Sequence, residues 1–436
     1  MPPSFDRRHP GRLGGPGITR PGRLWDRPSR RPGTYAGSIG HSVCVLHTRR
    51  LQLSRGINGL SLSLILVGAM PRPSARADSS ITYNYADYSE TAGRVGVHTQ
   101  GILAEQDLGA DFKISVTAIN DAIAGATPTG IPAPAGSNQV PLAILHDHRK
   151  AWETDLSHQF DRFNVTAGYA ESREHDYISK GWSLNTLTDF NQKNTTLLFG
   201  VAGHDDSVET FYDPQHFYAK QHSFSSILGV TQLIDPRTTF TLNVTWARDT
   251  GYLSDQYKAV QKTLELVPGS FFTLVFPENR PSERNSGVLF ACVNRAFPEL
   301  RGALEGSYRF YADTYGVAAN TLEVKWLQKL GDTLVLAPDF RFHEQGAADF
   351  YHYNLDTTDI VPTYIPSPSG PAYSSDYRLS SLQAVTYGLN LSWKPRSWLK
   401  LTLDYSRYNM RGRDGVTPQS AYPDANIYTA GAQISW

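Results

Sequence analysis

The most constraining feature of the sequence is its last eleven residues, 426–436, which alternate between apolar and polar side chains. One phase of this alternation holds Tyr428, Ala430, Ala432, Ile434 and Trp436, and the other holds Thr429, Gly431, Gln433 and Ser435. Successive side chains of a β-strand point to opposite faces, so this pattern predicts a strand with one face toward lipid and one toward a lumen. Bacterial outer-membrane barrels end in such a strand, and Trp436 is expected to be the residue that the barrel assembly machinery reads as an insertion signal.

The same alternation recurs along the chain. Phe240, Leu242, Val244 and Trp246 interleave with threonine and asparagine, and Leu399, Leu401, Leu403 and Tyr405 interleave with lysine, threonine and aspartate. A tilted strand needs about 9–11 residues to cross a membrane. Segments of this kind predict strands at 80–89, 94–105, 110–121, 148–159, 162–174, 191–203, 206–213, 220–233, 237–250, 284–297, 300–312, 317–329, 332–344, 378–394, 397–411 and 425–436.

The connections between these segments come in two kinds. Short ones hold turn residues, such as Asp161-Arg162 and Leu330-Gly331-Asp332, and long ones lie near 122–147, 176–190, 251–283, 345–377 and 412–424. Short periplasmic turns that alternate with long extracellular loops are typical of outer-membrane barrels. The sequence therefore predicts an all-β, transmembrane, antiparallel up-and-down barrel of about sixteen strands, or fourteen without the weaker segments 80–89 and 206–213.

The N-terminal part of the chain differs in charge from the rest. Residues 1–77 contain thirteen arginines, no lysine and two acidic residues, whereas the remainder has 41 − 13 = 28 basic and 41 − 2 = 39 acidic residues. We interpret residues 1–48 as a disordered extension or a misassigned translation start, with the alternative of a basic arm that binds nucleic acid. This difference in charge indicates a domain boundary between residues 1–77 and the acidic remainder of the chain.

A secretory signal follows this extension. Residues 49–77 contain a positive region with Arg49, Arg50 and Arg55, a short apolar run at 60–70, and the sequence Ala75-Arg76-Ala77. These are the three parts of a signal peptide, with cleavage before Asp78. We therefore expect export, a barrel formed by residues 78–436, and a location in the outer membrane of a Gram-negative bacterium.

Several segments of the body are similar to those of a known family. They are residues 121–130 (DAIAGATPTG), 174–182 (EHDYISKGW), 189–194 (DFNQKN), 277–281 (PENRP) and 308–313 (YRFYAD). In this order they resemble a family of uncharacterised bacterial outer-membrane barrel proteins that is catalogued as a domain of unknown function. The resemblance covers residues 80–436 and implies a barrel in the outer membrane. It implies no reaction, so it supplies no catalytic residue.

Charged residues in the polar phase are the main candidate site. A charge that faces lipid near the bilayer midplane costs about 2–4 kcal/mol for arginine or lysine, so these residues are expected to line the lumen. They are Asp111, Lys113, Arg301, Glu305, Arg309, Glu323, Lys325, Asp339 and Arg341. One interpretation is a charged constriction that selects a solute. The other is a self-neutralising network that holds the shape of the barrel, which the mixture of signs favours.

Two further groups of residues are candidate sites. Glu278, Asn279 and Arg280 lie between two prolines in a long loop, which could enter the pore, bind a partner or form an ordinary turn. His146, His148, His204 and His216 are ligand-type residues, but nothing in their spacing indicates that three or four of them converge, so no metal site is predicted.

The sequence contains no nucleophile elbow, phosphate-binding glycine loop or HExxH helix. We therefore expect a protein that is not an enzyme and holds no cofactor: a porin-like channel or a passive barrel scaffold. The alternatives are a barrel that sheathes or docks a periplasmic redox partner, and an outer-membrane barrel hydrolase. The expected partners are outer-membrane lipid, the barrel assembly machinery and, in the scaffold case, a periplasmic protein, but not nucleic acid.

Overall fold

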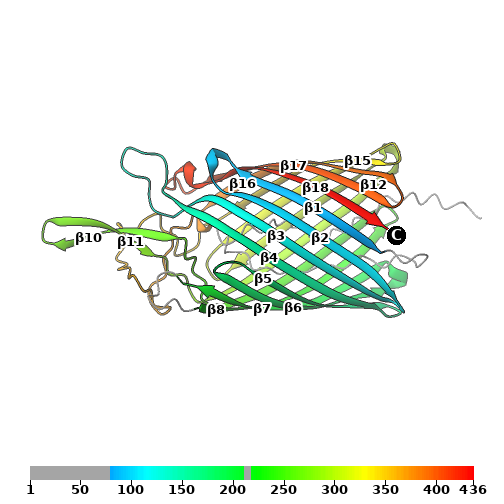
Figure 1. Cartoon of the computed structure of the whole chain (residues 1–436), viewed down its shortest axis with the longest axis horizontal. Helices are drawn as coiled ribbons and strands as arrows, with labels where there is room; N and C mark the ends of the chain where they lie inside the picture. The colour runs from blue at the N-terminus through cyan, green and yellow to red at the C-terminus, as the bar shows by residue number, and fades with distance from the viewer. Residues whose placement is uncertain (1–78, 211–217) are drawn as a thin grey trace, which may run out of the picture. The chain divides into compact units, whose positions relative to one another are not determined.

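The structure is a computed structural model that describes residues 79–210 and 218–436. Within these residues, sixteen strands form one closed antiparallel barrel, and two further strands form a separate hairpin (Figure 1). The extension and signal peptide predicted at 1–48 and 49–77 lie outside the described residues. No helix in the described part of the chain is long and apolar enough to cross a membrane.

The bounds of the barrel strands, in chain order, are β1 (Ser80–Glu90), β2 (Gly96–Gly109), β3 (Phe112–Pro128), β4 (Leu142–Gln159), β5 (Phe163–Arg173), β6 (Tyr177–Phe190), β7 (Thr195–Glu209), β8 (Tyr218–Asp235), β9 (Thr238–Gly251), β12 (Glu283–Phe297), β13 (Gly302–Asp313), β14 (Ala318–Leu330), β15 (Leu334–Gln345), β16 (Leu382–Arg396), β17 (Leu399–Gly412) and β18 (Asp424–Ser435). The hairpin consists of β10 (Ala259–Val267) and β11 (Ser270–Pro277).

The barrel closes between its first and last strands. β1 pairs with β18 along its whole length, from Ser80 opposite Ser435 to Glu90 opposite Ala425. At the end of this pair the amide of Trp436 donates to the carbonyl of Ser79 at 3.0 Å, and the amide of Ser79 donates to the carbonyl of Trp436 at 3.3 Å. Because closure pairs both edges of the sheet, the barrel strands leave no long edge free to pair with another chain.

The outer face of the barrel is apolar. On β14, Leu322 and Val324 are exposed, whereas Glu323 and Lys325, which alternate with them, are half-buried. Large apolar side chains are exposed at alternate positions on other strands in the same way, as Leu228 on β8 and Leu403 on β17 show. Since the hydrophobic effect disfavours such a surface in water, this face is suited to lipid, and the alternate residues line the lumen.

The predicted number of barrel strands is confirmed. However, one strand was missed and one was predicted in excess, so the two errors left the count unchanged. Residues 177–190 form β6 rather than the predicted loop. Gly181 and Asn185 resemble loop residues in sequence, but Trp182 and Leu184 on the same strand are exposed and form its outer face. Conversely, residues 206–209 are not a separate strand but the end of β7. Asp206 resembles a turn residue in sequence, but its side chain is buried and contacts His204 within the same strand.

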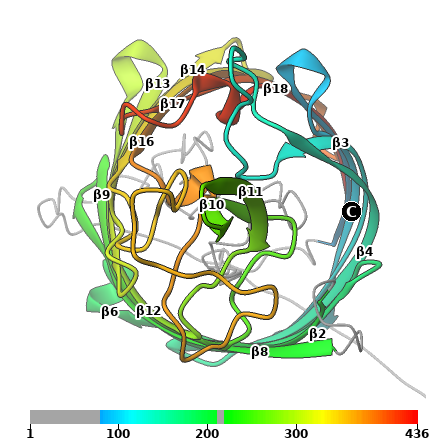
Figure 2. The same cartoon turned by 90° about the vertical axis from the view of Figure 1, so that its left-hand side faces the viewer.

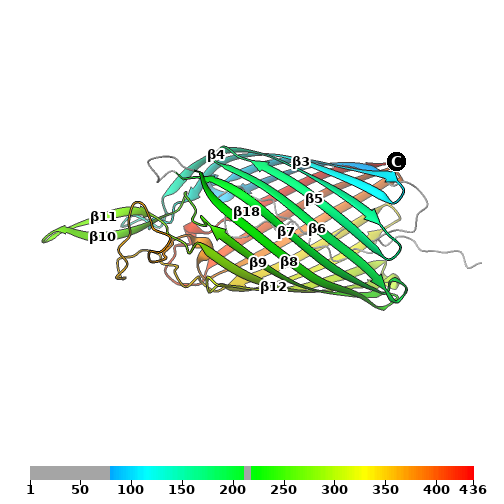
Figure 3. The same cartoon turned by 90° about the horizontal axis from the view of Figure 1, so that it is seen from below.

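The connections differ between the two ends of the barrel, which we call the turn end and the loop end. The turn end holds both ends of the described chain and tight connections such as 110–111, 236–237 and 331–333. The loop end holds the long connections 129–141, 252–282, 346–381 and 413–423, and β10–β11 projects from it (Figures 1 and 3). The predicted difference between short turns and long loops is therefore confirmed, although 91–95, 174–176 and 314–317 at the loop end are also short.

Apolar packing between loops occurs at the loop end, where loops 252–282 and 346–381 fold together. Val260 and Phe276 at the base of the hairpin pack against Leu355 and Tyr373 of the second loop. Seen from this end, the hairpin and the two loops lie within the outline of the strand ring (Figure 2). The two loops and the base of the hairpin therefore extend over the mouth of the barrel.

Candidate functional site

Six of the predicted lumen residues form one patch on the inner wall of β13, β14 and β15. We call Glu305, Arg309, Glu323, Lys325, Asp339 and Arg341 the lumen patch. The strand register places Glu305 opposite Lys325 and Lys325 opposite Asp339, so opposite charges alternate across three strands. In the next row toward the loop end, Glu323 lies opposite Arg341. Cross-strand neighbours of opposite charge stabilise a sheet, which explains how charges of both signs are accommodated here.

Lys325 lies at the centre of the lumen patch. Its Nζ atom is 3.9 Å from Oε1 of Glu305 and 4.0 Å from Oε1 of Glu323. Arg309 is less well satisfied, because its Nε atom is buried and has no hydrogen-bond partner in the described part of the chain. In the lumen patch the charge of Lys325 is therefore balanced by nearby glutamates, whereas the Nε–H group of Arg309 remains available as a hydrogen-bond donor.

The remaining predicted lumen residues lie at the turn end, and the assignment of two of them to strands was wrong. Asp111 (φ 63°) and Arg301 (φ 51°) have left-handed backbone conformations and occupy the turns before β3 and β13. Both strands were predicted to begin two residues too early, at 110 and 300 rather than 112 and 302. Lys113 does lie on β3, where its Nζ atom is 2.5 Å from Oε1 of Glu105 on β2.

The sequence reasoning missed the acidic residues on the opposite wall. β4 is eight strands from β14 in the ring of sixteen, and its inner face carries Glu153 and Asp155. Closer to the loop end the same face carries Arg149, which is 2.5 Å from Asp121 of β3. Counting alternate positions from the exposed Trp152 would have revealed this face, because all of these residues lie within the predicted strand 148–159, although β4 begins six residues earlier, at 142.

A second cluster of charges joins the two long loops over the mouth. We call Asp255, Lys258, Glu278, Arg280, Asp376 and Arg378 the clamp. Arg280 lies 2.6 Å from Glu278 and, through its Nη2 atom, 2.7 Å from Asp376 of the other loop. All three of these side chains are almost fully buried. The predicted loop residues Glu278 and Arg280 therefore bind a neighbouring loop instead of projecting freely.

Arg378 and Lys258 complete the clamp. Arg378 forms ion pairs with Asp376 and with Asp255, the latter at 2.6 Å. Lys258 is fully buried and donates from Nζ to the carbonyl of Pro128 at 2.5 Å and to Thr127 Oγ1 at 3.2 Å, at the end of β3. With three acidic and three basic side chains, the clamp balances its charge while it ties both loops to the rim of the barrel.

Asn279 connects the same loops through its backbone. Its amide donates to the carbonyl of Tyr373 at 2.9 Å, and the amide of Tyr373 donates back to its carbonyl at 2.8 Å. The Asn279 side-chain amide donates to the carbonyls of Ser367 and Pro371. The segment between Pro277 and Pro281 is thus the point at which loop 252–282 attaches to loop 346–381.

Burial and neighbouring charges change the protonation equilibria of the clamp. Burial raises the pKa of Glu278, although Arg280 opposes this effect. For Asp376 burial acts in the same direction, but Arg378, Lys258 and Arg280 together outweigh it and lower its pKa. Burial, helped by repulsion from Arg378, lowers the pKa of Lys258 from 10.5 to about 8. Lys258 therefore loses its proton closer to neutral pH than an ordinary lysine does.

We predict from this shift that the clamp becomes more stable as the pH rises above 8. Below pH 8, Lys258 is protonated whether or not the clamp is formed, so the cost of burying its charge is fully present. Between pH 8 and about 10.5 the formed clamp binds fewer protons than the released one, so stability rises, by on the order of 3 kcal/mol at the top of this window.

The measurement is the rate of proteolytic cleavage in loops 252–282 and 346–381 at each pH, taken as a ratio between wild type and Lys258→Met so that changes in protease activity cancel. Wild type should gain protection relative to the variant across this window. A ratio that is constant with pH would contradict the prediction.

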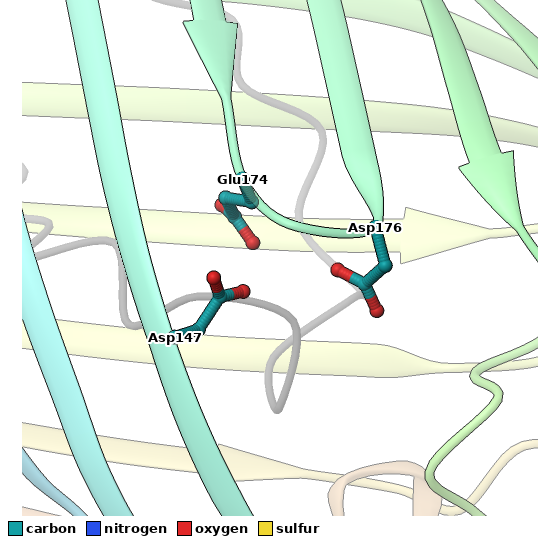
Figure 4. Close-up of side chains that lie close together, drawn as sticks. All are labelled: Asp147, Glu174 and Asp176. Atoms are coloured by element: carbon teal, nitrogen blue, oxygen red, sulfur yellow. The ribbon is translucent and has the colours of Figure 1, made fainter.

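An acidic group lies beneath these loops at the rim (Figure 4). Asp147 of β4 and Glu174 and Asp176 of the β5–β6 connection have carboxylate oxygens within 4.8 Å of one another. Carboxylate oxygens of this kind are ligands for hard cations. However, Asp176 already accepts hydrogen bonds from Gln256 at 2.5 Å and Tyr257 at 2.8 Å, which belong to loop 252–282. We interpret the group as a further attachment point of that loop and assign no metal to it.

The candidate histidines do not join this acidic group into a metal site. The strand alternation of β4 places His146 and His148 on the face opposite Asp147. His204 points into the lumen, where its Nδ1 atom is 3.0 Å from Asp206. His216 lies outside the described residues.

Comparisons with known proteins identify a family but no activity. Residues 134–426 match a family model described as a protein of unknown function, DUF3570. No curated protein matches the sequence. The match covers most of the chain, from the loop before β4 into the last strand.

Solved structures that are similar to the chain include outer-membrane proteins of low identity. One is a bacterial polysaccharide outer membrane secretin, with a TM-score of 0.45 and 11% identity over 83% of this chain and all of that one. Another is OmpT of Vibrio cholerae without loop L8, with a TM-score of 0.41 and 8% identity over 83% of this chain and 99% of that one.

A third is the ferric enterobactin receptor PfeA in complex with BCV-L6, with a TM-score of 0.42 and 12% identity over 82% of this chain. The chain spans 61% of the length of that receptor. Similarities of this size assign no function to the chain.

Proposed function

The chain belongs to the DUF3570 family of proteins of unknown function, and we propose that it works as a porin-like channel in the outer membrane of a Gram-negative bacterium. The observation that carries this proposal is the polar, charged inner wall of a closed sixteen-stranded barrel whose outer wall is apolar. Barrels of sixteen to eighteen strands enclose a lumen wide enough for an aqueous channel. The proposal includes no catalytic step.

In this proposal the outer face contacts lipid and the loop end faces the outside of the cell. Trp436 is the signal that the barrel assembly machinery recognises. The clamp fixes loops 252–282 and 346–381 over the mouth, which leaves the space beside these loops as the entrance for solutes. Solutes then enter beside the loops and pass the lumen patch.

Conductance across a planar lipid bilayer tests the channel. We expect the purified protein to produce discrete conductance steps, and a variant without the β10–β11 hairpin, residues 259–277, to produce larger ones because less chain covers the mouth. A heat-modifiable band on a gel shows that each variant has formed its barrel.

The absence of conductance in both proteins, with intact barrels, would rule out the channel. A periplasmic protein that then co-purifies in stoichiometric amount would favour the scaffold alternative instead.

A further inference from the structure

Two arginines of the lumen patch lie diagonally across the inner face of β14. In the register Arg309 lies opposite Thr321 and Arg341 lies opposite Glu323, two residues away on the same strand. Both strands start at the turn end and both side chains point to the lumen, separated only by the inner face of β14. The two guanidinium groups are close enough to repel each other electrostatically.

The two glutamates of the lumen patch do not satisfy this pair. Glu305 and Glu323 are drawn toward Lys325. Glu323 lies opposite Arg341 in the register, yet no ion pair within 4.0 Å joins them in the described residues. Nε of Arg309 is buried without a hydrogen-bond partner among those residues. A buried donor left without an acceptor costs about 1–3 kcal/mol, and more when it is charged, so this pair has unused capacity to bind an anion.

Polar groups surround the pair on the lumen side. Thr321 lies directly opposite both Arg309 and His343 in the register, and its hydroxyl is 2.8 Å from Nδ1 of His343. Arginine presents its N–H groups in a planar fork that matches the two oxygens of a carboxylate or phosphate group. The arrangement therefore offers two forks to one oxyanion.

We propose that Arg309 and Arg341 form a binding site for the carboxylate or phosphate group of a solute in the lumen. This inference rests on the channel proposed above and names the chemical class of solute that the channel favours. The site lies between the covered mouth and the turn end, so an anionic solute that enters beside the loops meets it during passage.

The test measures binding of inorganic phosphate to the purified barrel by titration calorimetry at pH 7, independently of conduction. We expect saturable binding to wild type, weakened roughly tenfold or more in Arg309→Gln/Arg341→Gln. The variant Arg309→Lys/Arg341→Lys keeps the charge but loses the forks, so its affinity should fall between the two.

The matched control is Lys113→Gln/Lys329→Gln, which also removes two lumen cations, each already engaged in an ion pair at the turn end. This control should bind phosphate like wild type, and heat modifiability confirms that every variant forms its barrel. Equal weakening in the control would show a general charge effect and overturn the site, as would unchanged binding in the glutamine variant.

Bilayer recordings separate this inference from the proposed function. Conductance with unchanged phosphate binding in the glutamine variant refutes the site and keeps the channel. Arginine-dependent binding without conductance supports the site and refutes the channel.

Discussion

Replacing Arg280 by methionine is expected to release loops 252–282 and 346–381 from the mouth of the barrel. Arg280 is 4% exposed and forms ion pairs with Glu278 of its own loop and with Asp376 of the other loop. Removing one partner of a buried ion pair leaves an uncompensated charge and typically costs about 3–5 kcal/mol. That cost falls on the loops, because the strands are held by their own ladder of hydrogen bonds.

Limited proteolysis measures the release. We expect loop cleavage in Arg280→Met to be at least about tenfold faster than in wild type, while the heat-modifiable barrel persists. In planar bilayers the same variant should show larger or noisier conductance steps. Loops that stay as resistant to protease as in wild type would show that the clamp does not hold them.

Two further variants locate the cause of the effect. Arg237→Met breaks an exposed pair with Glu299 at the turn end, at 2.7 Å, and should change nothing measurable because exposed pairs contribute about 0–1 kcal/mol. Adding Glu278→Gln to Arg280→Met removes the charge that would otherwise be buried alone, so it should restore part of the protection. If Glu278→Gln restores no resistance to protease, the loss in Arg280→Met comes from lost packing and not from the unpaired charge.

Deleting Trp436 is expected to lower the amount of folded barrel in the membrane several-fold. The residue has two roles in the structure that both contribute to this result. Its backbone makes the last two hydrogen bonds that close the barrel against Ser79, and the residue is 55% exposed at the turn end. Deletion removes the closing bonds together with the aromatic group that we expect the assembly machinery to recognise.

The measurement is the fraction of heat-modifiable protein in the outer-membrane fraction. Trp398→Ala is the matched control, because Trp398 is also exposed at the turn end and accepts a hydrogen bond only through its backbone carbonyl, from Ser435. The control should insert normally. An unchanged yield after deletion of Trp436 would contradict the assigned role, and an equal loss in the control would show that any interfacial aromatic residue matters as much.

Local patterns in the sequence predicted most of the barrel. Where alternation assigned inner and outer faces, as on β9 and β14, the exposed side chains follow the predicted phase, because a strand side chain can point only to one of two sides. The same reasoning failed at β6 and at the end of β7, where inward-facing polar residues such as Asn185 and Asp206 resemble turn residues. In a barrel with a polar lumen, such residues belong to the strand, so polarity alone does not mark its end.

The sequence by itself determined that the chain forms a barrel, and it indicated the inward-facing charges of β13, β14 and β15, since these follow from the period of two and from the cost of placing a charge in lipid. The tertiary structure alone decided which of those charges meet. The strand register places Arg309 and Arg341 diagonally across β14, and the folding of two loops joins Arg280 to Asp376, which lies 96 residues farther along the chain. No local pattern encodes such pairs, because they depend on the closure of a ring and on contacts between distant loops that form only when the whole sheet is in place.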